Sequence, residues 1–402
     1  MSIYTNCEDV IVNKRTTCSV CDNNNLVEIM DMPEFPITGL FSSSKYDGPL
    51  LGIDQAFLWC TECGHGQLQN QVSPQILYDP QEYTYRTSSS NMARGSVKVF
   101  LDYLKTVASD RMFNCIMDIG CNDLFLLNEI KDFGKTRVGL DPIWASEKPE
   151  NEDHNLIVIG GTVENTDLDK YLPCKPDLII CRHTLEHVFD PGLVLEKLID
   201  CASEDALFLF EIPGADSLVA KGRFDMVFHE HLQYFSLSSF NTLIEKCGAG
   251  MIGFEEHYHF WGALMVAFKK GISKRDKIKF PYTGKCIKRN KDIFLSQMDN
   301  TRKILDGFKN TRIYGYGAAL MLSVLAYYLK SDLSFITAII DDDKEKDGIY
   351  YANLPLKVKH SSRINDLTES TVLLTAIEHV KPIMTKLLSS RPRHIICPLH
   401  VI

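Results

Sequence analysis

The stretch Asn114–Ile130, "NCIMDIGCNDLFLLNEI", predicts a strand, a tight turn and a helix in direct succession. An apolar run leads into a turn over Asp118–Asp123 that contains Gly120, and a second apolar segment follows at helical spacing. A strand that passes directly into a helix is the repeating unit of parallel α/β sheets. We therefore expect this segment to begin an α/β domain.

The same alternation continues after this segment. Ala93–Val107 predicts a helix that leads into the domain, and four further strand candidates follow, in "RVGLDP" (137–142), "LIVIGGTV" (156–163), "PDLIICRHTLEHV" (176–188) and "DALFLFEIP" (205–213). This pattern predicts a doubly wound, Rossmann-like parallel sheet. Ligands of such sheets bind at the carboxyl ends of the strands, where the strand order reverses.

The first turn indicates which cofactor this sheet binds. It lacks the G-x-G-x-x-G pattern of dinucleotide sites, whereas Asp118 precedes Gly120 by two residues and Asp141 ends the next strand. This arrangement suits S-adenosylmethionine, because a strand-end carboxylate can bind both ribose hydroxyls and a glycine lets the backbone approach the cofactor. The alternative is that these acidic residues only cap helices. We expect the pocket to be lined by Asp118, Gly120, Asn122 and Asp141.

Two C-x-x-C pairs near the start of the chain predict a metal site. They are Cys18 with Cys21 and Cys60 with Cys63, and the 38 residues 22–59 separate the pairs. Each short loop can direct two thiolates at one ion, and four thiolates form a closed, structural zinc site. The alternative is four unligated buried cysteines. His65 is surplus to such a site, so we expect it either at the surface or next to the cysteine ligands without binding the metal itself.

Length and composition fix the general class of the protein. A chain of 402 residues exceeds one ordinary core, so we expect two to three domains. The net charge of -9 argues against nucleic acid as a partner, and no apolar run approaches the roughly 18 residues of a membrane span. The 13 scattered cysteines fit a reduced, cytoplasmic protein with some metal-binding thiols. We expect a monomer or weak oligomer without a membrane segment.

The last third of the chain predicts a second α/β sheet. Its strand candidates lie in "RIYGYGAALMLSVLAYYL" (312–329), "ITAIIDDDKEKDG" (336–348), "TVLLTAI" (371–377) and "RHIICPL" (393–399). The G-x-G turn in the first of these is a weak phosphate-binding signal. We expect a zinc-binding module over residues 1–80, a methyltransferase domain over 81–270 and a Rossmann-like domain over 271–402.

The stretch Phe224–Ser236, "FDMVFHEHLQYFS", has three ionisable residues in a row and so suggests a chemical role. In a strand, His229 and His231 would share one side and Glu230 would face the other. Two histidines without clear further ligands make a hydrolytic zinc site a poor fit. A packed core segment is also disfavoured, because ionisable groups are costly to bury unpaired. Proton transfer remains the better interpretation.

These motifs together resemble a known family. Paired C-x-x-C sequences, "CGHGQL", "DIGCND", "RHTLEHV", "HEHLQYFS" and "DDDKEKDG", in this order, are similar to the nucleotide-sugar C-methyltransferases of deoxysugar biosynthesis. The resemblance spans nearly the whole chain and implies a zinc module, a central S-adenosylmethionine domain and a C-terminal Rossmann-like domain. It also implies methyl transfer to a sugar carbon beside a keto group, usually C3 of a dTDP-linked 4-keto sugar.

The resemblance assigns roles to particular residues. It places the base function at Glu230 and His231, and it places His183 at the end of the fourth strand, facing the substrate. Tyr83 or Tyr85 corresponds to a family tyrosine near the sugar. Removal of a proton from carbon requires a base and donors for the enolate oxygen, and histidine exchanges protons near neutral pH.

The chain departs from the family at three places. Phe228 stands where the family often has tyrosine, Leu124 follows Asn122 and Asp123 where the family usually has glycine, and "AIE" (376–378) replaces "AWN". We expect Leu124 to reshape the methionine pocket. Beside C-methylation, methylation at oxygen or nitrogen of a related sugar and a zinc-bearing binding protein without turnover stay open.

Overall fold

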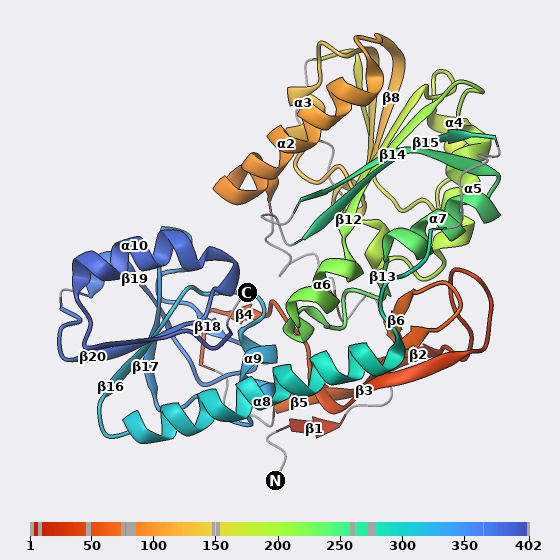
Figure 1. Cartoon of the computed structure of the whole chain (residues 1–402). Coiled ribbons are helices and arrows are strands. Elements are labelled where there is room, and N and C mark those ends of the chain that lie inside the picture. The colour runs from red at the N-terminus through yellow and green to blue at the C-terminus, as the bar shows by residue number, and fades with distance from the viewer. Residues whose placement is uncertain are drawn as a thin grey trace.

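The computed structural model describes residues 4–6, 10–45, 50–73, 77, 86–146, 149, 153–257, 262–271, 278–364 and 366–399. Figure 1 shows two α/β units and a smaller β-rich module that lies below the first unit. One long helix, α8 (Gly284–Phe308), runs along the module and reaches the second unit. This architecture confirms the expected fold class. Among the described residues, no helix is both long enough and apolar enough to span a bilayer.

The central unit is built on a seven-stranded sheet with the order β10-β9-β8-β11-β12-β15-β14. The order reverses between β8 and β11, so the ligand edge lies at their carboxyl ends. Five strands are parallel and were predicted: β8 (Phe113–Ile119), β9 (Gly134–Leu140), β10 (Leu156–Ile159), β11 (Leu178–Arg182) and β12 (Leu207–Pro213). The prediction did not include the two antiparallel strands at one edge, β14 (Ala249–His257) and β15 (Ala263–Lys270).

Helices connect these strands. Helix α2 (Asn91–Ala108) begins where Ser90 accepts a hydrogen bond from the main-chain N–H of Ala93, and its ends lie within two residues of those of the expected helix. The helices that follow α2 in this unit are α3 (Phe125–Glu129), α4 (Leu168–Tyr171), α5 (Pro191–Cys201), α6 (Ala215–Lys221) and α7 (Leu237–Lys246). Short 3₁₀ turns lie at the ligand edge and beyond it: η2 (Thr87–Ser89), η3 (Pro142–Trp144), η4 (Leu185–His187) and η5 (Phe224–Met226).

The second α/β unit has five parallel strands in the order β19-β17-β16-β20-β21. They are β16 (Arg312–Tyr316), β17 (Ile336–Asp341), β19 (Val358–His360), β20 (Ser370–Leu374) and β21 (His394–Ile396). Its helices are α9 (Leu322–Tyr328) and α10 (Val380–Ser390), with short turns η6 (Lys344–Lys346), η7 (Ser361–Arg363) and η8 (Ile377–His379). The four expected strands are therefore confirmed.

The N-terminal module contains a sheet that takes strands from two distant parts of the chain. Its strands are β1 (Tyr4–Asn6), β3 (Leu26–Pro36), β5 (Leu50–Cys60), β6 (Gly66–Leu68) and β13 (Gln233–Tyr234). Two small ribbons pair β2 (Ile11–Lys14) with β7 (Asn70–Val72), and β4 (Phe41–Ser42) with β18 (Tyr350–Tyr351) of the second α/β unit. The segment that follows His231 thus extends the module's sheet.

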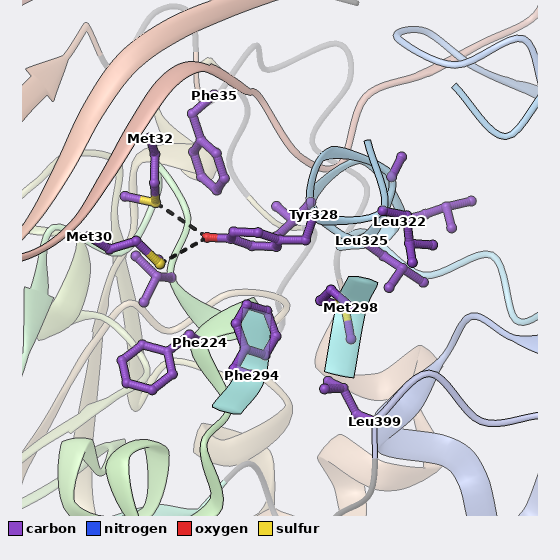
Figure 2. Packing of buried hydrophobic residues seen from close by; sticks show 14 of the residues in the cluster. Met30, Met32, Phe35, Phe224, Phe294, Met298, Leu322, Leu325, Tyr328 and Leu399 are labelled. Atoms are coloured by element: carbon purple, nitrogen blue, oxygen red, sulfur yellow. Dashed lines mark hydrogen bonds between the residues drawn. The ribbon is translucent and has the colours of Figure 1, made fainter. Parts of the chain in front are cut away.

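One apolar core joins the module to the second α/β unit. Figure 2 shows Tyr328 of α9 extending toward β3, where its hydroxyl contacts the sulfur atoms of Met30 and Met32 at 3.6 and 3.4 Å. Phe294 of α8 packs edge-on against Tyr328, with ring centroids 4.9 Å apart. The module therefore shares its interior with residues almost 300 positions later in the chain.

Candidate active site and metal centre

The four predicted cysteines come together at the base of the N-terminal module. The Sγ atoms of Cys18 and Cys63 lie 3.7 Å apart, those of Cys21 and Cys60 lie 3.5 Å apart, and all four lie within 4.8 Å of one another. Sulfur atoms bound tetrahedrally to one zinc at about 2.3 Å are about 3.8 Å apart. The donor set and spacing therefore fit a closed zinc site.

Two tight turns direct these thiols inward. Main-chain hydrogen bonds from Asp22 to Cys18 (3.0 Å) and from Gly64 to Cys60 (3.1 Å) close the turns. Gly64 adopts a φ of +75°, and a Cβ there would lie 2.6 Å from Phe280, so the second turn requires glycine. The local fold thus explains why both pairs have two intervening residues.

His65 supports this centre from a buried position, so the surface alternative was wrong. Its Nε2 lies 3.1 Å from Ser19 Oγ and 3.0 Å from Gln233 Oε1, and burial lowers its pKa to about 4. Gln233 belongs to β13 and follows His231 by two residues. The neutral imidazole therefore connects the cysteine turns to the "HEHLQYFS" segment.

The four predicted cofactor residues lie at the carboxyl ends of β8 and β9. Asp118 is buried, and burial, with the nearby Asp141, raises its pKa to about 7 against the opposing effect of Arg182. The Asp141 carboxylate accepts hydrogen bonds from the main-chain N–H groups of Asn122 (2.9 Å) and Ile143 (3.0 Å). The capping role considered for Asp141 is therefore present, and its binding of ribose stays a prediction.

Gly120 is required for a reason that the sequence did not show. It has a φ of +73°, and a Cβ there would lie 2.0 Å from the Thr184 hydroxyl. Thr184 follows β11, and its hydroxyl donates to the carbonyls of Arg182 and Ile119. The glycine thus lets β8 and β11 approach closely at the switch point of the sheet.

Leu124, the residue in place of the family glycine, adopts a left-handed backbone with φ of +65° at the start of α3. Its side chain is buried in an apolar cluster with Phe100, Leu104 and Leu127. The turn keeps the glycine-type conformation, and the leucine side chain packs in the domain core.

His183 lies beside two carboxylates at the end of β11. Its Nδ1 is 3.5 Å from Glu186 Oε1, and its Nε2 is 3.7 Å from Glu211 Oε1. Burial alone would lower the pKa of His183, but Glu211 and Glu186 raise it to about 9. Arg182 pairs with Glu211 at 2.5 Å and, with His183, lowers the pKa of Glu211 to about 2 despite burial. His183 is therefore an imidazolium near neutral pH.

His231 has the opposite electrostatic environment. Burial lowers its pKa well below the usual value, and His187 and His183 lower it further. Donor atoms of Glu186, His187 and His231 lie within 4.8 Å of one another, and the rings of Phe228 and His231 are in contact with centroids 4.1 Å apart. A neutral imidazole therefore lies near an imidazolium at this edge of the sheet.

Glu230 and His229 point to different neighbours. Glu230 Oε1 accepts a hydrogen bond of 2.5 Å from the Thr38 hydroxyl, while His229 Nε2 lies 3.0 Å from the carbonyl oxygen of Phe35. The expected strand was wrong here, because His229 and Glu230 form a turn closed by the main-chain bond from His231 to Phe228, and the strand β13 begins only at Gln233.

Sequence reasoning missed several residues of this site. Glu211 carried no motif of its own, Glu186 lies in "RHTLEHV" without a role assigned to it, and Thr38 lies 192 residues from Glu230. The "RHTLEHV" segment was a signal for Glu186 and His187, because both follow β11 within one turn of His183. Tyr83 and Tyr85 lie outside the described residues.

A small hollow opens beside His231. Lys221 and Arg223 line this hollow, together with Glu378 from the second α/β unit. Arg223 is buried and pairs with Asp225 at 2.8 Å and with Glu378 at 2.6 Å. The two α/β units are thus joined by an ion pair next to the candidate site.

Three family models match consecutive parts of the chain. A zinc binding domain matches residues 18–78, a methyltransferase domain matches 92–252, and a C-methyltransferase C-terminal domain matches 286–397. The C-methyltransferase NovU of Streptomyces niveus is 25% identical over 250 residues, which are 60% of this chain and 58% of that protein. The chain thus aligns with little more than half the length of this relative.

Solved methyltransferases show a distant similarity to part of the chain. An S-adenosylmethionine-dependent methyltransferase from Clostridium acetobutylicum has a TM-score of 0.33 and 12% identity over 43% of this chain and 89% of its own. The N-methyltransferase NodS from Bradyrhizobium japonicum, solved with S-adenosyl-L-homocysteine, has a TM-score of 0.34 and 10% identity over 45% of this chain and 88% of its own.

The matched models account for each part of the architecture described above. The zinc binding domain contains the cysteine cluster, and the methyltransferase domain contains the switch point between β8 and β11. The chain therefore matches, in consecutive order, family models for a zinc-binding domain, a methyltransferase domain and the C-terminal domain of C-methyltransferases.

Proposed function

We propose that this enzyme methylates a ring carbon beside the keto group of a nucleotide-linked deoxysugar, in the simplest case C3 of a dTDP-linked 4-keto sugar. The observation that carries the proposal is the pair of oppositely tuned histidines, His183 with a raised pKa and His231 with a lowered one. Groups whose environments move their pKa values apart are typical acid–base pairs.

The two histidines divide the work of making a carbon nucleophile. His231 is neutral and accepts the proton from the ring carbon, with Glu230 next to it in the turn. His183 is cationic and donates a hydrogen bond to the oxygen on which the enolate charge develops. S-adenosylmethionine, when bound, supplies an electrophilic methyl group.

The cofactor would be held at the adjacent strand ends. Asp118 and Asp141 flank the turn after β8, and the Asp141 carboxylate, already ordered by two main-chain N–H groups, has lone pairs for ribose hydroxyls. Lys221, in the lining of the hollow beside His231, is the cationic group that supports a position for the anionic substrate there. This placement aims the substrate carbon at the sheet edge.

The test is incubation of the protein with S-adenosylmethionine and a panel of dTDP-4-keto-6-deoxyhexoses, followed by mass spectrometry and NMR of the products. We expect one new C–CH₃ group, and exchange of the neighbouring C–H with solvent deuterium even without cofactor. A methyl group found on oxygen or nitrogen, with no exchange at carbon, would contradict the proposal.

A further inference from the structure

The carboxylate of Glu230 is held by a residue of the zinc module. The hydroxyl of Thr38, on the segment that follows β3, donates to Glu230 Oε1 at 2.5 Å, and Thr38 is only 5% exposed. A hydroxyl-to-carboxylate bond of this length is at the short, strong end of the range for ionised acceptors. The contact therefore fixes one carboxylate oxygen.

The second α/β unit holds Thr38 in place from the other side. The carbonyl of Ile37 accepts hydrogen bonds from Asn353 Nδ2 at 2.6 Å and from Ser323 Oγ at 3.2 Å. The main-chain N–H of Gly39 donates to the carbonyl of Leu320 at 3.3 Å. The residues on both sides of Thr38 are thus bound to the C-terminal unit, so the hydroxyl is presented from a fixed backbone.

The main chain of Glu230 is fixed as well. Its carbonyl accepts a hydrogen bond from His187 Nδ1 at 2.8 Å, which also sets the tautomer of that imidazole. Nearby titratable groups include His231, the next residue, and Tyr234, whose pKa is raised by burial and further by Glu230 and Glu186. Thr38 supplies the described contact that orients the Glu230 side chain itself.

We propose that Thr38 is a positioning residue of the active site, through which the zinc module and the C-terminal unit together fix the Glu230 carboxylate next to His231. This inference rests on the proposed role of Glu230 in proton removal. It also assigns a function to the module beyond metal binding, because the module completes the site of the central domain.

The chemistry of the bond predicts what Thr38 changes. Burial raises the pKa of Glu230, and the hydrogen bond from Thr38 opposes this shift because it stabilises the ionised form. Loss of one hydrogen bond to a charged group corresponds to a shift of about 1 to 2 pH units in the titration midpoint. Thr38→Val should therefore raise the midpoint of Glu230, while Thr38→Ser, which keeps the hydroxyl, should leave it near its original value.

The experiment measures that midpoint directly. The infrared carbonyl band of the protonated Glu230 carboxyl group, assigned by its loss in Glu230→Gln, is followed against pH in the zinc-loaded full chain. Thr301→Val is the matched control, since Thr301 is equally buried and donates to the carbonyl of Pro398, far from Glu230 in the sequence. We expect an upward shift in Thr38→Val only.

Turnover with a dTDP-4-keto-6-deoxyhexose gives the second readout. Thr38→Val should lower kcat by about tenfold or more, the equivalent of one hydrogen bond to a charged group, with the KM for S-adenosylmethionine unchanged and with rescue by Thr38→Ser. An unchanged Glu230 midpoint, or an equal loss of kcat in Thr301→Val, would overturn the inference. Normal turnover in Glu230→Gln and His231→Asn would instead refute the proposed function, so the two failures are distinguishable.

Discussion

The imidazole of His229 and the carbonyl of Phe35 are hydrogen bonded at 3.0 Å, and this bond attaches the turn Phe228–His231 to strand β3 of the zinc module. Its other nitrogen lies 3.3 Å from Gln55 Nε2, and burial lowers the pKa of His229 to about 4. His229 is thus a neutral residue that joins two domains, although it stands two positions from the proposed base.

The first prediction follows from this contact. His229→Asn should lower the free energy of unfolding by about 1 to 3 kcal/mol, because buried partners lose their hydrogen bonds. Turnover measured well below the melting temperature should remain near that of the wild type. Chemical denaturation and steady-state kinetics check the two effects. A loss of turnover in His229→Asn larger than that in His231→Asn would show that His231 is not the base.

A second prediction concerns His231 and Glu230. His231→Asn should lower turnover by roughly 10² to 10⁴, the usual contribution of one general base, and should leave cofactor affinity unchanged. Glu230→Gln should have a related effect. In the double variant the activation free energy should rise by less than the sum of the two single increases, because the residues act as a unit. Single-turnover kinetics and calorimetric titration of S-adenosylmethionine provide the measurements, and additive losses would argue for separate roles.

The third prediction is a pH limit set by His183. Because Glu211 and Glu186 raise the pKa of His183 to about 9 against burial, the imidazolium is present at neutral pH and is lost as the pH rises through about 9. The rate kcat/KM should therefore fall above about pH 9. His183→Gln keeps a hydrogen-bond donor without a proton to lose, so this limb should disappear from its profile. A limb that persists unchanged in the variant would arise from another group.

Removal of zinc forms the fourth prediction. Elemental analysis should find one zinc per chain, and Cys60→Ser should lower Tm by about 5 to 15 °C, as expected for the loss of several kcal/mol in a chain of this size. Cys174→Ser is the control, since Cys174 is an exposed thiol outside the cluster. Protein without tightly bound metal, or equal destabilisation by both changes, would contradict the zinc site.

Leu124 provides the fifth prediction. Leu124→Gly relieves a left-handed backbone, a gain of about 1 to 2 kcal/mol, but empties a buried leucine position, a loss of about 2 to 5 kcal/mol. The packing loss is larger, so the variant should be less stable although glycine is the usual family residue. Urea denaturation measures this, and a more stable variant would show that backbone strain dominates. S-adenosylmethionine affinity should change less than stability, because the side chain packs in the core cluster.

The sequence predicted those parts of the fold that depend on local patterns. Strands such as Leu178–Arg182 are short apolar runs that lead into helices. The C-x-x-C spacing of the paired cysteines likewise predicts the tight turns on which they lie. The antiparallel edge Ala249–Lys270 was missed because two strands follow each other there without a helix between them. The sequence could not show that Phe228–His231 is a turn, since the same alternation of residues suits a strand.

The site was predictable only where one segment carries its own chemistry. His183, Glu230 and His231 lie in recognisable segments, whereas the contact of Thr38 with Glu230 depends on packing across 192 residues. The raised pKa of His183 likewise depends on Glu211, which lies on a neighbouring strand. Tertiary contacts of this kind have no counterpart in the periodicity or spacing of a single sequence.

The contact between Tyr328 and the methionines of β3 has a consequence for synthesis of the protein. Met30 leaves the ribosome 298 residues before its partner does, an interval of roughly 15 to 60 s at about 5 to 20 residues per second. During that interval the apolar face of β3 lacks the helix that covers it in the folded protein. The first segment translated is therefore among the last to complete its packing.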